Sequence, residues 1–222
     1  MIFSKDEAIV LPTYKEQAYK LIKEAIIFQR FKPDEMYSQE TICNELGISR
    51  TPVREALLEL QREHYIAFCR GRGITVVPIS ESMAKDILEV RLCNEKFGAR
   101  LAAERATDVE LSKIKCTLDK ALQVADNNDN TELYKLDYAF HNAIMEASHN
   151  LWLLRSVNEL RDQCLRFENQ NAYDGKHSAS AIIEEHRKIF QHISERDADG
   201  AEAAINEHLL AAYNRTMSKY MP

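Results

Sequence analysis

Four polar side chains in the second half of the chain fall among apolar residues, and their types suit metal binding. Asp137 and His141 are four positions apart, so both leave the same face of a helix. His186 and His208 each lie among isoleucine and leucine residues. Buried carboxylates and imidazoles are costly without partners, and one Asp with three His offers the oxygen and nitrogen ligands of a divalent transition metal. We therefore expect these four residues to meet in a helical core around such an ion.

Two other interpretations of this set stay open. A single histidine on an apolar face is usually a core residue held by hydrogen bonds, so each histidine could be structural. A metal centre with open positions could also serve catalysis. However, the sequence contains no HExxH motif, nucleophile elbow or phosphate-binding loop, and we expect no further carboxylate beside the four to act as a base. The sequence therefore predicts a protein that is not an enzyme.

Six amphipathic segments must position these residues. From Ser80 onward the chain has no strand pattern and little glycine, and one helical pattern follows another. The patterns predict helices that begin at Ser80 and Thr107, run over about 131–148, begin at Asn150, cover 182–193 and continue from a break at Asp199-Gly200 to about 219. Polar loops are expected over 126–130 and 172–178. Residues 80–222 are thus predicted to form an all-α helical bundle.

A second candidate site lies in the first quarter of the chain, in the run Ser49-Arg50-Thr51-Pro52-Val53-Arg54. This run follows a helix-like segment over 38–46 and a turn at Gly47, so the two segments describe a helix-turn-helix. The start of the second helix presents unpaired backbone N–H groups and the positive end of the helix dipole, which suit phosphate. Arg50 and Arg54 share one face. The run indicates a DNA-binding regulator.

A basic hairpin is expected after this helix. Residues 65–68 and 74–77 read as two short strands, joined by Arg70-Gly71-Arg72-Gly73. The glycines let the backbone of such a tip approach DNA, and the arginines supply charge. With a helix predicted over 14–28, residues 1–79 are predicted to form a winged helix-turn-helix domain, so the whole chain is mainly α.

These motifs resemble the winged helix of GntR-type bacterial regulators over roughly residues 12–78. The resemblance implies DNA contacts from the recognition helix, and contacts in or beside the minor groove from the wing. The residues concerned are Ser49, Arg50, Thr51, Arg54, Gly71, Arg72 and Gly73. Some members have an arginine early in the preceding helix, where this chain has Gln39 and Glu40, so no base contact is carried over to that helix.

The second half resembles the FCD ligand-binding domain of FadR-type GntR regulators. The likeness rests on the segments Asp137-Tyr138-Ala139-Phe140-His141, Glu185-His186-Arg187 and Glu207-His208-Leu209. Members with this set of one Asp and three His bind Zn²⁺, Ni²⁺ or a similar metal, which commonly helps to hold a small carboxylate. The resemblance implies a metal cofactor, Zn²⁺ or Ni²⁺ before others, and a small organic or sugar acid as effector. Six helices favour the shorter VanR-like variant, and the seven-helix FadR-like variant is the alternative.

Arg91 is the residue that we expect to pair with the carboxylate of the effector. It follows Ile87 by four positions, so it can face inward, and a guanidinium binds a carboxylate through two hydrogen bonds. The alternative is a surface ion pair with Glu95, four residues further on. Arg161 and Arg166 are weaker candidates and are expected on solvated faces.

Together these features predict a homodimeric transcription factor in which metal and acid binding change the affinity for DNA. A twofold dimer implies a pseudo-palindromic operator in double-stranded DNA. Release of DNA by the effector is the commoner behaviour in the family and favours a repressor, with an activator as the alternative. The alternative is a regulator without an organic effector, in which DNA affinity responds to the metal alone.

The composition predicts a cytoplasmic protein with two domains and no membrane partner. A chain of 222 residues can bury two modest cores, and no apolar stretch approaches the roughly 20 residues that span a membrane. Five cysteines without CxxC spacing indicate reduced thiols. Residues 1–80 hold 11 basic and 11 acidic side chains, so the net charge of −6 lies beyond them and does not oppose a local basic patch.

Overall fold

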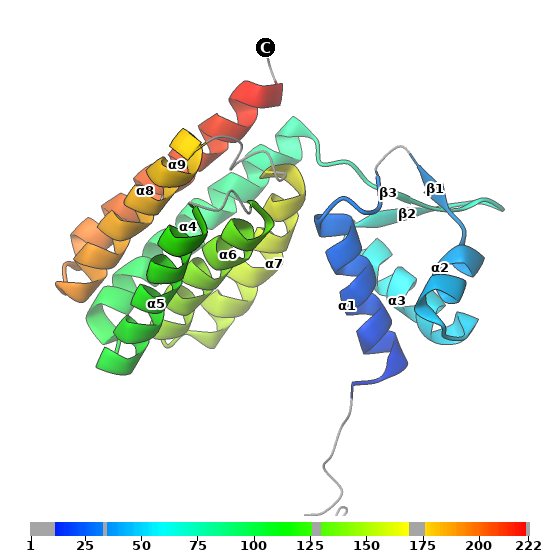
Figure 1. The fold of residues 1–222 in the computed structure, drawn as a ribbon, viewed down its shortest axis with the longest axis horizontal. Helices are drawn as coiled ribbons and strands as arrows, with labels where there is room; N and C mark the ends of the chain where they lie inside the picture. The colour runs from blue at the N-terminus through cyan, green and yellow to red at the C-terminus, as the bar shows by residue number, and fades with distance from the viewer. Residues whose placement is uncertain (1–11, 33–34, 126–129, 169–175, 221–222) are drawn as a thin grey trace, which may run out of the picture. The chain divides into compact units, whose positions relative to one another are not determined.

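The computed structural model describes residues 12–32, 35–125, 130–168 and 176–220 (Figure 1). The chain divides into two compact units, Met1–Pro78 and Ile79–Pro222. The first is a winged helix-turn-helix and the second is a helical bundle, so the predicted fold class is confirmed.

Over its described residues, the first unit combines three helices with a three-stranded antiparallel sheet. Its elements in chain order are α1 (Tyr14–Ile27), β1 (Met36–Tyr37), α2 (Gln39–Leu46), α3 (Arg50–Arg62), β2 (Ile66–Cys69) and β3 (Gly73–Val76). The strand order is β1-β3-β2, with Ile66 opposite Val76 and Met36 opposite Thr75. Strand β1 was not predicted, because two residues are too few to show an alternating pattern.

Local signals explain where these helices begin and end. The Ser38 hydroxyl accepts a hydrogen bond from the Thr41 N–H at 3.0 Å and caps α2. Gly47 ends α2 with φ 65°, a left-handed conformation that suits glycine. Ser49 then takes an extended conformation as the N-cap residue of α3. The sequence therefore produces the tight turn that sets α3 against α2.

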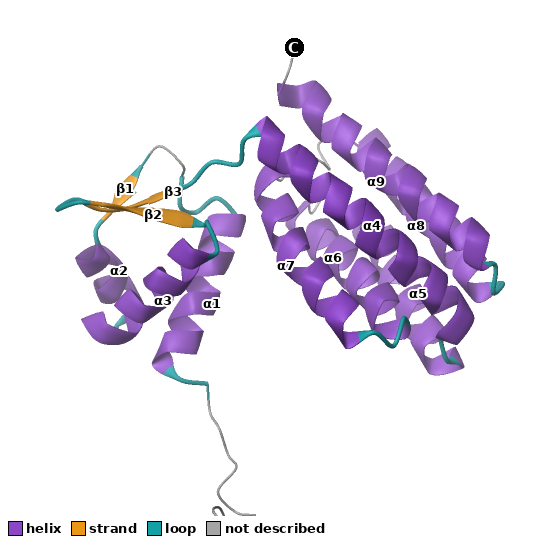
Figure 2. Ribbon diagram, turned by 180° about the vertical axis from the view of Figure 1, so that it is seen from behind, coloured by secondary structure: helices purple, strands orange, loops and turns teal. Residues whose placement is uncertain are grey.

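The second unit shows six helices in the part of the chain that the structure describes (Figure 2). They are α4 (Glu81–Arg105), α5 (Asp108–Ala125), α6 (Asn130–Ala147), α7 (Leu151–Glu168), α8 (Lys176–Ser194) and α9 (Ala198–Tyr220). Ser80, Thr107 and Asn150 accept hydrogen bonds from backbone N–H groups at the starts of α4, α5 and α7. Helix α4 contacts α6, α7, α8 and α9, so it forms the middle of the bundle.

Two predicted boundaries in this unit are wrong. Helix α9 already begins at Ala198, because the Asp197 carboxylate accepts from the Gly200 N–H at 3.0 Å and caps it. Asp199 and Gly200 thus lie in the first turn of α9, where an N–H needs no helical partner. Residues 176–178 are helical and not part of a loop, and residues 126–129 and 169–175 lie outside the described residues. Within the described ranges, no helix combines the length and apolar character needed to cross a membrane.

Candidate metal centre and DNA-binding surface

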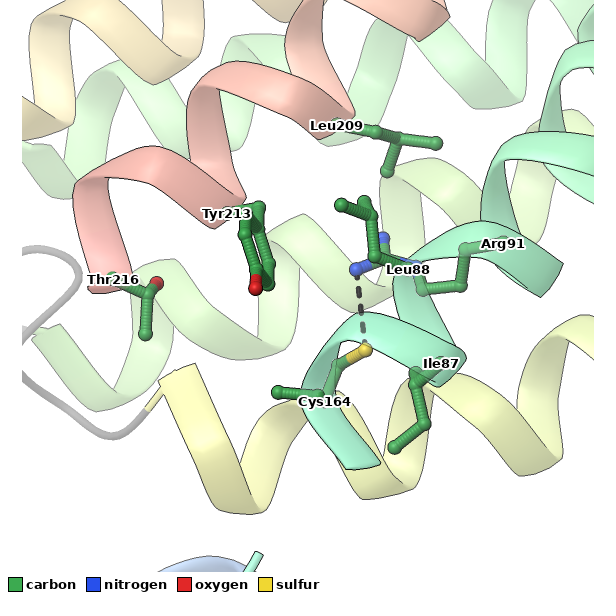
Figure 3. A pocket seen from close by; sticks show the side chains of 8 residues that line it. Ile87, Leu88, Arg91, Cys164, Leu209, Tyr213 and Thr216 are labelled. Atoms are coloured by element: carbon green, nitrogen blue, oxygen red, sulfur yellow. Dashed lines mark hydrogen bonds between the residues drawn. The ribbon is translucent and has the colours of Figure 1, made fainter. Parts of the chain in front are cut away.

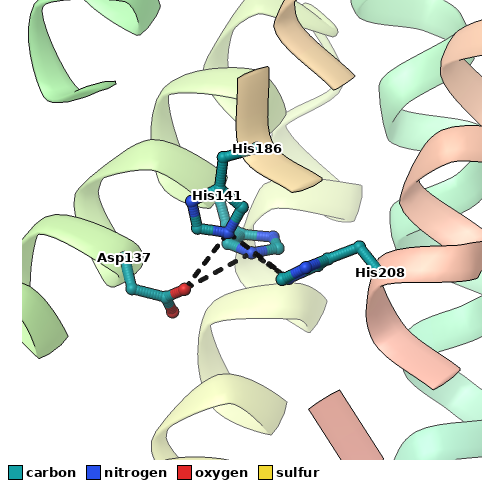
Figure 4. A group of neighbouring side chains, drawn as sticks. All are labelled: Asp137, His141, His186 and His208. Carbon is teal, nitrogen blue, oxygen red and sulfur yellow. Dashed lines mark hydrogen bonds and ion pairs between the residues drawn. The ribbon is translucent and has the colours of Figure 1, made fainter. Parts of the chain in front are cut away.

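The four predicted metal ligands meet inside the helical unit (Figure 4). Asp137 and His141 come from α6, His186 from α8 and His208 from α9. The three imidazoles are buried, and the Asp137 side chain is 13% exposed. One ligand atom from each residue lies within 4.8 Å of all the others. Packing of α6, α8 and α9 thus brings together side chains that are up to 71 positions apart in the sequence.

The spacing of these atoms matches a metal coordination shell. The Nε2 atom of His208 lies 3.1 Å from Nε2 of His141 and 3.4 Å from Nε2 of His186. Asp137 Oδ1 lies 3.3 Å from Nε2 of His186 and 3.9 Å from Nε2 of His141. Ligands about 2.0–2.1 Å from a tetrahedral Zn²⁺ ion are separated by about 3.3–3.4 Å. Three of the four separations are close to this value, so the four atoms lie near enough to share one ion.

Two carboxylates fix the orientation of the histidine rings. Glu95 Oε2 lies 2.7 Å from Nδ1 of His141, and Glu185 Oε2 lies 2.8 Å from Nδ1 of His208. An ionised carboxylate only accepts, so each Nδ1 donates and each Nε2 carries a lone pair. These two lone pairs then face each other at 3.1 Å and repel unless a cation lies between them. The donor set therefore fits a divalent metal ion.

Two further carboxylates lie beside the ligands, which the sequence analysis did not foresee. Glu95 on α4 is fully buried against His141, and Glu185 on α8 contacts His208 on α9. These pairs bridge different helices, so spacing within one helix could not reveal them. Both carboxylates accept hydrogen bonds from the histidines, which is the usual way in which a protein orients ligating imidazoles.

The ionisation of this cluster favours neutral imidazoles beside charged carboxylates. Burial lowers the pKa of His141 to about 3, and the nearby positive charge of Arg161 lowers it further. The negative charges of Glu95 and Asp137 raise this pKa but do not outweigh these two effects. Burial also lowers the pKa of His208 to about 4, although the hydrogen bond to Glu185 opposes it. Burial alone would raise the pKa of Asp137, but Arg161 and His186 outweigh it and hold that pKa well below its ordinary value.

Arg161 is buried, which corrects its predicted solvated position. Only 2% of the residue is exposed, and its NH2 group donates to Oδ2 of Asp137 at 2.7 Å. It shares the inner face of α7 with Val157 and Cys164, which are also buried. Arg166 is only partly exposed and donates to Gln163, so it too is less solvated than expected.

Arg91 faces inward as expected but is already engaged by side chains of the protein. Its Nε donates to Glu95 Oε1 at 2.6 Å and its NH1 donates to the Cys164 sulfur at 3.3 Å (Figure 3). The alternative pairing with Glu95 is therefore present, although in the core and not on the surface. The cavity beside Arg91 has a volume of about 20 Å³ and is also lined by Leu209 and Tyr213. It has room for about one water molecule, so an effector at Arg91 needs a wider cavity.

The side chains of the predicted recognition helix are accessible. Ser49, Arg50, Thr51 and Arg54 are exposed at the start of α3. Arg50 lies 3.6 Å from Glu40 on α2 and its backbone carbonyl accepts from the Gln39 amide at 3.0 Å. Gln39 and Glu40 therefore both contact Arg50, an arrangement that the sequence alone did not indicate.

The two wing glycines differ in what requires them. Gly71 has φ 70° at the exposed tip, next to Arg72, and a Cβ atom there would meet nothing within 4 Å. Gly73 has φ 117°, and a Cβ atom there would lie 2.2 Å from the backbone oxygen of Tyr37. Close packing of β3 against β1 is therefore sufficient to explain why position 73 needs a glycine. DNA contact by these residues remains a prediction.

Comparison with known proteins gives the same organisation. Residues 14–76 match the family described as "Bacterial regulatory proteins, gntR family", and residues 86–211 match the FCD domain. The chain is 28% identical over 205 residues to the uncharacterized HTH-type transcriptional regulator YdhC of Bacillus subtilis, covering 90% of this chain and 88% of that protein. It is 28% identical over 193 residues to the Glc operon transcriptional activator of Escherichia coli, covering 78% and 76%. The structure of E. coli McbR/YncC superposes with a TM-score of 0.85 and 20% identity, covering 95% of this chain and 100% of that one.

Proposed function

Because this chain belongs to the gntR family of bacterial regulatory proteins and carries an FCD domain, we propose that its helical unit binds a divalent metal and a small carboxylate that modulate its binding to an operator. Membership of the family establishes the general function, without the metal or the effector. The protein is a DNA-binding transcriptional regulator, and its relatives and fold are those of regulators and not of enzymes.

One observation carries the metal proposal. The Nε2 atoms of His141 and His208 face each other at 3.1 Å while a carboxylate holds Nδ1 of each ring. Asp137, His141, His186 and His208 would hold the ion, and Zn²⁺ or Ni²⁺ fits these ligands. When bound, the metal would act as a Lewis acid that attracts an oxygen of an anionic effector. In this chain Glu95 and Glu185 orient the rings, and surrounding apolar residues such as Phe140 and Ile189 exclude water.

The charges around the site support an anionic effector. Arg91 and Arg161 balance Glu95 and Asp137 in the core, so a divalent cation adds two positive charges that a small acid would offset. We propose an organic or sugar acid that binds at the metal, with Arg91 contributing once the adjacent cavity widens. The competing candidate, in which the metal alone is the signal, rests on the same four ligands and the small size of that cavity.

Operator binding is proposed to use α3 and the wing. Ser49, Arg50, Thr51 and Arg54 would contact the major groove, with Gly71, Arg72 and Gly73 in or beside the minor groove. In a homodimer the two copies of α3 would face a pseudo-palindromic operator. We propose that the protein is a repressor and that the effector releases it from DNA.

The paired faces of α4 and α7 are proposed as the dimer surface. These helices lie side by side, because Asn94 donates to Ser156 at 3.0 Å. Phe97 on α4 and Trp152 on α7 are 50% and 78% exposed, which is unusual for large apolar side chains. A second copy of the chain would cover them. Size-exclusion chromatography of Phe97→Asp should then show a monomer, whereas Val109→Asp, on the exposed face of α5, should remain dimeric.

Elemental analysis of the purified protein tests the metal proposal. The wild-type protein should contain about one metal ion per chain, and the Asp137→Ala/His208→Ala double variant should contain none. If the wild-type protein lacks metal and does not take up Zn²⁺ or Ni²⁺, the four residues are a structural cluster. Gel-shift titrations with the metal, with and without a panel of small carboxylic acids, then separate the two signalling modes. A response to metal that no acid changes would favour the metal-only candidate.

A further inference from the structure

The two carboxylate oxygens of Asp137 have different partners. Oδ1 faces the imidazoles and lies 3.3 Å from Nε2 of His186. Oδ2 accepts a hydrogen bond from Arg161 NH2 at 2.7 Å. Figure 4 shows the carboxylate at the edge of the histidine group, with its contacts to the rings made on one side. Only one oxygen is therefore directed at the centre of the cluster.

Arg161 is held firmly in the position that creates this asymmetry. Its guanidinium lies between Asp137 and Glu95, whose Oε2 is 3.9 Å from NH1. It also lies 5.5 Å from the centre of the Tyr138 ring, within the range of a cation–π contact. The Arg161 side chain is only 3% exposed. Because it is contacted on several sides, the guanidinium has little room to rotate away from Asp137.

The denticity of Asp137 decides how many positions a metal would have for other ligands. A carboxylate that binds through both oxygens occupies two positions, and one that binds through a single oxygen occupies one. A charge-assisted hydrogen bond of 2.7 Å competes for Oδ2 and keeps it away from the centre. Three imidazoles and one oxygen are four ligands, so a metal that expands from four to five or more ligands has room for one from solution.

We propose that Arg161 is a positioning residue that restricts Asp137 to single-oxygen metal binding and so keeps one metal position available for an anion. This role rests on the metal site proposed above and goes beyond it. Arg161 lies on α7, a helix that supplies none of the four ligands. It would nevertheless control whether an effector can bind to the metal.

Cobalt substitution provides the test, because the visible spectrum of Co²⁺ reports its coordination without any DNA. The Co²⁺-loaded wild-type protein should change its spectrum when titrated with sodium azide. The Arg161→Met variant should still bind Co²⁺, show an altered spectrum before azide and bind azide roughly tenfold or more weakly. Arg161→Lys restores one charged donor and should recover part of the azide affinity. Arg166→Met, on the same helix but bonded to Gln163, is the matched control.

The outcomes separate this proposal from the metal site itself. No Co²⁺ uptake by the wild-type protein contradicts the metal site. Co²⁺ uptake without an azide response in the wild type, or identical spectra and azide affinities in the wild type and Arg161→Met, overturns the role of Arg161. If thermal unfolding shows that Arg161→Met does not fold, Arg161→Gln decides. Its side chain is shorter and uncharged, so a wild-type Co²⁺ spectrum and azide affinity in that variant overturn the proposal.

Discussion

His141 Nε2 and His208 Nε2 lie 3.1 Å apart in the middle of the helical unit, and the other ring nitrogen of each is bound to a glutamate on a different helix. Two neutral imidazoles arranged in this way have no proton to share between them. The repulsion between the two lone pairs raises the free energy of the metal-free protein, and a bound cation removes it. Loss of one ligand should therefore change the metal content measurably.

His186→Ala is expected to lose the metal. It removes one of four ligands and leaves a gap beside Phe140, against whose ring His186 is stacked at 4.3 Å between centroids. Metal content after purification should fall from about one ion per chain to near zero. His192→Ala is the control, since His192 is on the same helix but bonds to Asp197 at the surface. Full occupancy in His186→Ala would remove this residue from the site.

Glu95→Gln is expected to destabilise the helical unit strongly. Glu95 is fully buried and contacts Arg91, His141 and Arg161, so its loss leaves buried positive charge without compensation. Breaking one partner out of a buried pair typically costs about 3–5 kcal/mol. Urea unfolding of the metal-free protein measures this, with Glu89→Gln on the exposed face of α4 as the control. Equal midpoints for the two variants would contradict the structural role of Glu95.

Arg54→Ala is expected to abolish specific operator binding without changing metal content or dimerisation. Arg54 is exposed in the first two turns of α3. Loss of an arginine that contacts a base costs about 1–3 kcal/mol, and the proposed homodimer would lose this contact in both half-sites. Fluorescence anisotropy with operator DNA provides the measurement, and Lys115→Ala on the exposed face of α5 is the control. An unchanged operator affinity would refute the assignment of α3 as the recognition helix.

Glu40→Gln is expected to strengthen binding to DNA of any sequence. Glu40 lies 3.6 Å from Arg50 and carries a negative charge next to the proposed DNA surface. Without that charge Arg50 can engage a phosphate, which should increase the salt dependence of binding by about one counterion. Titrations at several salt concentrations should show this for random-sequence DNA. Glu45→Gln, an exposed acid later in α2, serves for comparison. A weaker or unchanged affinity for random-sequence DNA would count against this role of Glu40.

The two wing glycines should differ in their tolerance of alanine. Gly71→Ala places a Cβ atom in open space at positive φ, a strain of about 1–2 kcal/mol. Gly73→Ala adds a clash with the Tyr37 backbone oxygen, so it should lower the melting temperature of the winged unit considerably more. Differential scanning calorimetry of both variants makes the comparison. Equal losses would mean that the sheet adapts to the added methyl group.

The features that could be predicted from the sequence are those that depend on residues within a single helix. The four-residue spacing of Asp137 and His141 and the hydroxyl groups of Ser80 and Thr107 report directly on local structure. The roles of Glu95 and Arg161 could not be predicted in this way, because their partners come from other helices. An arginine or glutamate is also expected at the surface unless its partner is known.

Errors in the boundaries had a similar cause. Asp199-Gly200 resembles a helix break in the sequence, yet a cap from Asp197 converts it into a helix start. Strand β1 exists because β3 lies beside it, with Tyr37 opposite Ile74. Both features depend on neighbours in space or on one hydrogen bond, which hydrophobic periodicity does not record.

A residue in the last turns of α9 helps to fix one of the histidines of the metal centre. Arg215 donates to both oxygens of Glu185 at 2.6 and 2.8 Å, and Glu185 in turn holds His208. A chain cut just before Arg215 would keep every ligand and still lose the clamp on one of them. Removal of Arg215 would therefore act on the metal centre without touching any of the four ligands.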